Sequence, residues 1–273
     1  MDDDFRDLIR DITDIADGLL ITAGAGMGVD SGLPDFRGEH GFWNAYPALR
    51  SSGVNFYDIA SPDAFITNPK QAWGFYGHRL NLYRKTIPNA GFAILRALAH
   101  QMPNGAFIFT SNVDGQFQKA SFSESQIVEC HGSIHHLQCI NGCLNEVSSA
   151  KDFQPETDDT ECLLLSPLPR CICCGEVTRP NILMFNDWKW ISKRMESQKA
   201  QFDEWLGKVT RLLIIEIGAG TSIPTVRKFS ESHAGYLIRI NPDEPEIPSH
   251  VKGISLPMTG LAGLQLLSDS ITD

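Results

Sequence analysis

Apolar side chains at helical spacing mark the start of the chain, namely Phe5, Leu8, Ile9, Ile12 and Ile15. This spacing predicts an amphipathic helix. Similar patterns predict helices over 90–100 and over 224–232, and Pro224 stands in the first turn of the latter.

Short apolar runs with little polar alternation predict strands that are covered on both faces. They occupy 18–21, 106–109, 126–129, 211–217 and 235–240. Because helical patterns separate some of these runs, the chain is predicted to be an α/β protein with a Rossmann-like, doubly wound parallel sheet.

Two segments interrupt this alternation. Residues 41–88 are rich in aromatics and prolines, and residues 136–180 hold six of the seven cysteines. We interpret both as insertions that build a smaller module over the sheet. The chain is then one domain over 1–273, divided into a large part from 1–40, 89–135 and 181–273 and a small module from 41–88 and 136–180.

The composition is that of a globular protein, with 42% hydrophobic and 21% charged residues in a chain of 273. A net charge of −10 argues against nucleic-acid binding. It favours basic partners such as lysine-rich segments, or serves only solubility. The acidic N-terminus has no signal-peptide core, and no apolar run reaches the roughly 20 residues of a membrane span. We therefore expect a cytoplasmic protein without membrane contact.

The cysteines form two close pairs, Cys139 with Cys143 and Cys171 with Cys174. Such pairs suit a tetrahedral zinc site, and four thiolates leave no position for a substrate, so the zinc is expected to be structural. Cys173 is a spare thiol whose spacing is less favourable. The alternative is a set of unrelated buried thiols.

Glycine-rich turns follow two of the predicted strands and are typical of pyrophosphate sites. The residues concerned are Gly24, Ala25 and Gly26 in the first turn, and Gly218, Gly220, Thr221 and Ser222 in the second. Either turn alone could serve only the backbone, but two in one sheet favour a dinucleotide. The acidic residue expected about 20 positions after the first glycines is missing. Asn241, which follows another strand, is the candidate ribose ligand, and this departure argues against a dehydrogenase.

Polar side chains stand at two further strand ends, where open sheets collect active-site groups. Ser111, Asn112 and Asp114 follow one strand, and His131 follows another. An isolated histidine is either a structural residue or a general base, and the position of His131 beside Gly132 favours neither outright.

These motifs together resemble the sirtuins, a family of NAD-consuming protein deacylases, over nearly the whole chain. The matching segments, in sirtuin order, are Gly24–Gly26, Gly32–Arg37, Ser111–Asp114, His131–Gly132, the two cysteine pairs, Arg179–Phe185, Gly220–Ser222 and Ile240–Asn241.

The resemblance implies that NAD is a co-substrate and that an acyl-lysine protein or peptide is the other substrate. The acyl oxygen attacks C1′ of the nicotinamide ribose, and the products are lysine, nicotinamide and O-acyl-ADP-ribose. His131 would be the general base, Asn112 would orient the ribose and a water, and Asp114 would bind the nicotinamide carboxamide.

The resemblance also assigns the segment Asp35-Phe36-Arg37 to the cofactor. Phe36 would cover the position that nicotinamide vacates, and Arg37 would order the cofactor loop. The chain departs from the family pattern at Gly28, where serine is usual, and at Ser111, where glutamine is usual. It departs again at Phe185-Asn186-Asp187, where the family has Phe-Gly-Glu in contact with the peptide.

Three residues resemble the acyl pocket of sirtuins that accept succinyl- or malonyl-lysine, namely Ala60, Tyr76 and Arg79. An arginine can pair bidentately with the distal carboxylate. Alternatively, Tyr76 and Arg79 share a helix face only to brace the module. The alternative functions are an NAD glycohydrolase or ADP-ribosyltransferase, and a non-catalytic NAD sensor. The sequence does not determine the oligomeric state.

Overall fold

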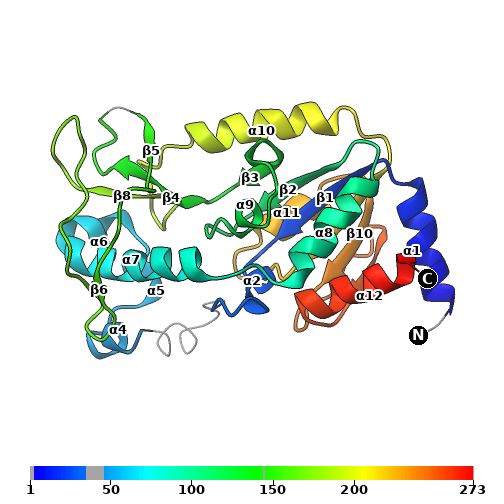
Figure 1. Cartoon of the computed structure of the whole chain (residues 1–273), viewed down its shortest axis with the longest axis horizontal. Coiled ribbons are helices and arrows are strands. Elements are labelled where there is room, and N and C mark those ends of the chain that lie inside the picture. Colours follow the sequence, from blue (N-terminus) through cyan, green and yellow to red (C-terminus); the bar gives the residue numbers. More distant parts are fainter. Residues whose placement is uncertain (1–2, 35–45, 144, 273) are drawn as a thin grey trace.

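The computed structural model describes residues 3–34, 46–143 and 145–272, and a six-stranded parallel sheet lies at its centre (Figure 1). The strands are β1 (Gly18–Ala23), β2 (Ala106–Thr110), β3 (Ile127–Glu129), β9 (Leu212–Ile217), β10 (Tyr236–Ile240) and β11 (Gly253–Leu256). Their order is β11-β10-β9-β1-β2-β3. This is the Rossmann order, and it reverses between β1 and β9. The predicted fold class is confirmed.

Helices cover both faces of this sheet (Figure 1). Leu19 and Ile21 of β1 face a core formed with α1 (Asp3–Ile15), α8 (Ala90–Gln101) and α12 (Gly260–Thr272). Leu20 faces the opposite core, formed with α10 (Lys193–Leu206) and α11 (Thr225–Glu231). Successive side chains of a strand point to opposite faces, so a continuous apolar run is what a doubly covered strand requires.

The predicted helices and strands are all present, with boundaries shifted by a few residues. Pro224 immediately precedes α11 instead of lying within its first turn. Two elements were not predicted, namely β11, a short strand that is only partly buried, and α12, which follows it. The segment 46–88 is largely helical, with α4 (Pro47–Ser51), α5 (Phe56–Ile59), α6 (Pro62–Thr67) and α7 (Pro69–Lys85).

A third core holds these helices against a small antiparallel sheet of order β5-β4-β8. Its strands are β4 (Gly132–Cys139), β5 (Val147–Ser149) and β8 (Thr178–Ile182), and β6 (Thr157–Asp158) pairs with β7 (Leu163–Leu164) nearby. The buried indole of Trp73 on α7 donates to the Thr178 carbonyl at 2.8 Å. β4 crosses the predicted boundary between residues 135 and 136, and β8 crosses the one between residues 180 and 181. Both strands therefore extend from the predicted large part into the predicted small module.

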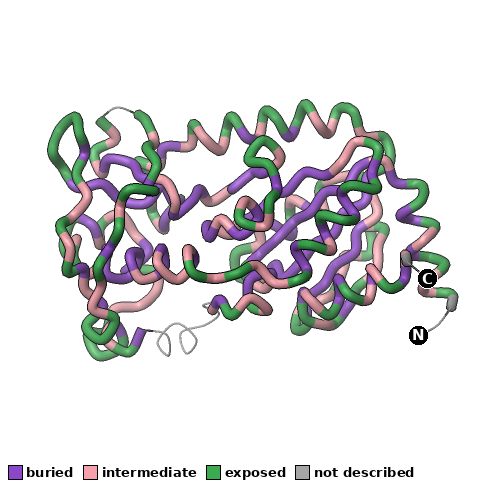
Figure 2. The backbone as a smooth tube through the Cα atoms, in the orientation of Figure 1, coloured by how far each residue is buried: buried purple, intermediate pink, exposed green. Residues whose placement is uncertain are grey.

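Short elements complete the fold, namely α2 (Gly26–Val29), α9 (Gln116–Lys119) and the 3-10 helix η1 (Glu124–Gln126). Figure 2 shows that the buried backbone follows the central strands and continues into the module. Within the described ranges, none of the helices has both the length and the apolar character needed to cross a membrane.

A buried ion-pair network ties the sheet to α11. Arg239 on β10 lies beside Glu216 on β9 and donates to its carboxylate at 2.6 Å. Arg239 also donates to Glu231 of α11 at 2.7 Å, and its side chain is fully buried. Removing one member of such a network leaves a charge in the interior without compensation.

We therefore expect Arg239→Met to lower the free energy of unfolding by about 3–5 kcal/mol, because Glu216 keeps a buried charge. Lys208→Met is the matched control, since the Lys208–Glu204 pair is exposed and is worth less than about 1 kcal/mol. Urea unfolding followed by circular dichroism measures both. Equal losses in the two variants would contradict this account of the buried network.

Candidate active site

The two glycine loops meet at the point where the strand order reverses. A Cβ on Gly24 would lie 2.6 Å from the Gly218 carbonyl oxygen, and a Cβ on Gly218 would lie 2.4 Å from the Gly26 Cα. Gly218 also has a φ of +59°, and the Gly26 amide donates to its carbonyl at 3.1 Å. These glycines therefore allow the loops to touch, in addition to the role with phosphate that the sequence suggested.

A cavity of about 810 Å³ opens at this crevice and extends between the sheet and the module. Predicted site residues that line it include Gly24, Ala25, Gly218, Gly220 and Ser222 from the glycine loops, Ser111, Asn112, Asp114 and His131 from the strand ends, and Ala60, Tyr76 and Arg79 from the module. Parallel sheets of this topology bind ligands in that place.

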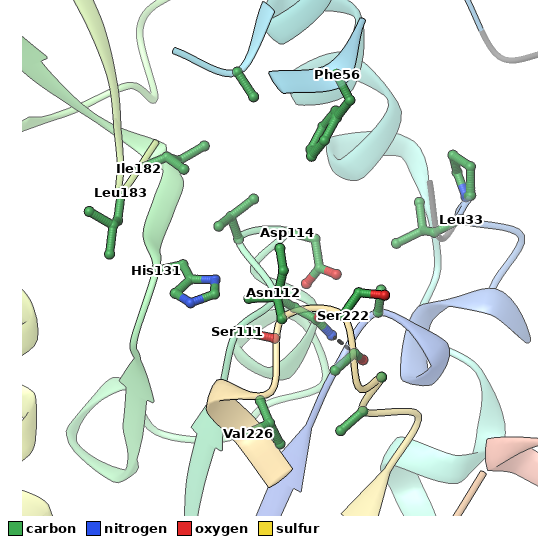
Figure 3. A pocket seen from close by; sticks show the side chains of 18 of the residues that line it. Leu33, Phe56, Ser111, Asn112, Asp114, His131, Ile182, Leu183, Ser222 and Val226 are labelled. Atoms are coloured by element: carbon green, nitrogen blue, oxygen red, sulfur yellow. Dashed lines mark hydrogen bonds between the residues drawn. The ribbon is translucent and has the colours of Figure 1, made fainter. Parts of the chain in front are cut away.

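Asn112, Asp114 and His131 lie together around the cavity (Figure 3). The Asn112 side-chain amide donates to the Gly24 carbonyl at 2.9 Å, shown as a dashed line in Figure 3. Its backbone amide donates to the Thr110 hydroxyl at 3.0 Å. The first glycine loop and the end of β2 thus fix Asn112 together.

His131 stands in the turn between β3 and β4, and its imidazole points into the cavity (Figure 3). The turn needs Gly132, which has a φ of +78° and lies so close to β8 that a Cβ would be 2.0 Å from the Asn181 carbonyl oxygen. Burial lowers the pKa of His131 below its usual 6.5. At neutral pH the imidazole is therefore uncharged and can accept a proton.

The Asp114 carboxyl is nearly inaccessible, with 9% of the residue exposed. Burial raises its pKa to about 6, and the Gln116 backbone amide opposes this by donating to Oδ1 at 2.9 Å. The carboxyl group is thus mostly ionised at neutral pH and can accept a hydrogen bond from an amide.

Aromatic side chains form the opposite wall. Phe185 contacts Tyr57 with ring centroids 4.4 Å apart, and it contacts Phe56 at 5.8 Å. The Phe185 amide donates to the Ala60 carbonyl at 3.0 Å, which joins the segment after β8 to the segment after α5. This wall therefore belongs to the module, while the polar groups belong to the sheet.

The segment after Phe185 keeps a tight turn despite lacking glycine. Asn186 has a φ of +56°, a left-handed conformation that asparagine tolerates better than most residues. Asp187 anchors the turn through an ion pair with Arg179 at 2.7 Å, and both side chains are fully buried. The departure from the family pattern at 186 is therefore compatible with a glycine-like backbone.

Arg79 and its neighbours form the end of the cavity within the module. The guanidinium carbon lies 5.2 Å from the Phe75 ring centroid, 5.9 Å from that of Tyr76 and 5.4 Å from that of Tyr83. Arg79 is only 8% exposed, so its charge is held in a largely dehydrated aromatic setting.

Several predicted cofactor residues lie elsewhere. Gly26 and Thr221 do not line the cavity, and the Thr221 amide donates to Glu244 at 2.8 Å. Asn241 is fully buried, where its side chain donates to the Ala219 carbonyl at 2.9 Å. Its ribose-binding role stays a prediction. The segment Asp35-Phe36-Arg37 lies outside the described residues.

Sequence reasoning missed several residues that line the cavity, including Tyr83, Asp243 and Glu244. Tyr83 could have been found from its position seven residues after Tyr76, on the same face of one helix. The two acidic residues follow the end of β10, and acidic side chains at strand ends often bind ribose.

The four paired cysteines converge as predicted. The sulfurs of Cys139, Cys143, Cys171 and Cys174 all lie within 4.8 Å of one another. Zinc–sulfur bonds of about 2.3 Å place the sulfurs of a tetrahedron about 3.8 Å apart, so the cluster fits zinc. Pairing of β4 with β8 sets Cys139 opposite Thr178 and so brings the two pairs together.

Comparison with known proteins gives a consistent result. Residues 24–215 match the model of the Sir2 family. An NAD-dependent protein deacylase of Aquifex aeolicus (strain VF5) is 28% identical over 84% of this chain and 85% of its own. One from Leptospira interrogans serovar copenhageni is 30% identical over 84% of this chain and 83% of its own.

Solved structures share the fold. A Sir2 homologue in complex with NAD superposes with a TM-score of 0.71 at 21% identity, covering 97% of this chain and 93% of that one. A Sir2 protein bound to a propionylated peptide gives a TM-score of 0.66 at 16% identity, covering 96% and 97%.

We expect the purified protein to contain equimolar zinc, and Cys171→Ser to lose the metal and to unfold at a lower temperature. Cys173→Ser is the matched control, because Cys173 is not among the four converging thiols. Elemental analysis and thermal unfolding measure both effects. Zinc loss in Cys173→Ser, or a midpoint unmoved by chelation, would contradict the assignment.

Proposed function

Because the chain belongs to the Sir2 family, we propose that it is an NAD-dependent protein-lysine deacylase. NAD supplies the ADP-ribosyl group that accepts the acyl group, and nicotinamide is the leaving group. The products are the free lysine side chain, nicotinamide and O-acyl-ADP-ribose.

One observation carries this proposal. A single cavity joins both glycine loops, the three polar groups at the strand ends and the aromatic wall of the module. A dinucleotide site alone would need only the sheet. The additional wall offers an apolar surface for a lysine side chain, whose methylene groups favour such an environment.

The side chains take distinct roles in this proposal. His131 accepts a proton from a ribose hydroxyl, for which its lowered pKa keeps it in the required neutral form. Asp114 accepts a hydrogen bond from the nicotinamide carboxamide, and Asn112 orients the ribose and a water. The backbone amides and hydroxyls of the glycine loops, including that of Ser222, bind the pyrophosphate.

The substrate is proposed to be an acyl-lysine protein or peptide that lies beside Phe185. Its acyl group would enter the end of the cavity formed by Ala60, Tyr76 and Arg79. The small Ala60 side chain leaves room there, and a buried guanidinium favours an acyl chain that ends in a carboxylate, such as succinyl or malonyl. Four free thiols in a metal-like cluster favour a reducing compartment such as the cytoplasm.

The first test replaces the proposed base. We expect His131→Ala to lower kcat/KM for acyl removal by at least about a hundredfold, because it removes the proton acceptor. NAD should still bind when measured by calorimetry. His100→Ala, at an exposed residue in the last turn of α8, is the control and should match the wild type.

Full activity of His131→Ala would refute the role of the histidine. Nicotinamide release by the wild type that does not depend on any acyl-lysine peptide would favour the NAD glycohydrolase or ADP-ribosyltransferase instead.

The second test addresses the acyl group. Arg79→Met should lower kcat/KM for a succinyl-lysine peptide by about tenfold to a hundredfold, the range of a charge-assisted hydrogen bond. Turnover of the matching acetyl-lysine peptide should change little. Arg50→Met, at an exposed residue of α4, controls for the loss of a surface charge. Equal losses on both peptides would indicate that Arg79 only braces the module.

A further inference from the structure

Tyr83 lines the same cavity as Arg79, and neither the sequence motifs nor the proposed mechanism uses it. We propose that Tyr83 is a specificity-determining residue that positions the Arg79 guanidinium for an acyl chain ending in a carboxylate. The inference rests on the proposed deacylase function and adds a determinant outside the Tyr76–Arg79 pair.

The contact between the two side chains is direct. Both Nε and Nη2 of Arg79 donate to the Tyr83 hydroxyl oxygen, at 2.9 and 2.5 Å. Since these two nitrogens form one edge of the planar guanidinium, the contact fixes the plane as well as the position of the group. A single aromatic contact would leave the guanidinium free to turn.

Helix geometry explains why this contact forms. Tyr76, Arg79 and Tyr83 are separated by three and four residues on α7, so they share one face of the helix. Burial raises the pKa of the Tyr83 phenol, which therefore keeps its proton. A neutral phenol that accepts from an arginine still has a hydrogen to donate.

The Tyr83 hydrogen can therefore bind a ligand oxygen. Among the described residues, the hydrogen bonds of the Tyr83 hydroxyl are the two that it accepts from Arg79. The distal carboxylate of an acyl chain carries two oxygens, so one can accept from Tyr83 while the guanidinium supplies the opposite charge. An acetyl group ends in a methyl group and has no distal carboxylate oxygen that could accept this hydrogen bond.

The backbone of Tyr83 is also held in place. Its carbonyl accepts from the Gln116 side chain at 3.2 Å, and the Gln116 backbone amide donates to Asp114. Tyr83 is 4% exposed, so its ring has little room to move. Hydrogen bonds of Gln116 thus connect Tyr83, at the acyl end of the cavity, with the carboxyl group of Asp114.

The test compares Tyr83→Phe with the wild type on succinyl- and acetyl-lysine versions of one peptide. This substitution keeps the ring and removes the hydroxyl. We expect kcat/KM for the succinyl peptide to fall about tenfold, mainly through KM, and that for the acetyl peptide to stay within about twofold. Tyr236→Phe, at the partly buried first residue of β10, is the matched control and should leave both unchanged.

A double variant separates positioning from general damage. If Tyr83 acts with Arg79, adding Tyr83→Phe to Arg79→Met should lower the ratio of succinyl to acetyl turnover by clearly less than Tyr83→Phe lowers it in the wild type. Independent, multiplying losses would overturn the inference, as would equal losses on both peptides or a gain on succinyl-lysine. A wild type that removes no acyl group at all would instead refute the deacylase function on which the inference rests.

Discussion

The loops after β1 and β9 touch because neither Gly24 nor Gly218 carries a side chain at the contact. Their backbones pair through the Gly26 amide, and the Gly24 carbonyl in turn accepts from Asn112. A larger residue at either glycine would separate the loops and move Asn112 with them. The position of Asn112 in the cavity therefore depends on this one close approach, at the reversal of the strand order.

The module makes the second half of the site. Its core packs α7 against β4 and β8, and those two strands also carry the turn of His131, the cysteine cluster and the approach to Phe185. The turns of the cysteine cluster and the turn of His131 are thus at opposite ends of one strand pair. Because β4 runs from Gly132 to Cys139, we expect loss of zinc to disturb the cavity through this strand.

The buried strands, the cysteine pairs and the glycine turns could be predicted from the sequence because each has a local sequence pattern. Buried strands read as apolar runs, and paired cysteines or glycine turns have their own spacing. Side-chain contacts between distant segments leave no such signal. The sequence could not show that Asn241 turns its amide toward Ala219, or that Glu244 reaches Thr221. Tyr83 was missed for a different reason, since helical periodicity marked its face but not which of its residues meet the cavity.

The central claim is that NAD is consumed only together with an acyl-lysine substrate. Mass spectrometry of the products from NAD and a panel of acyl-lysine peptides tests it most directly. We expect deacylated peptide, nicotinamide and O-acyl-ADP-ribose to form in equal amounts, with succinyl or malonyl peptides among those processed. Nicotinamide and free ADP-ribose formed at the same rate without any peptide would contradict it.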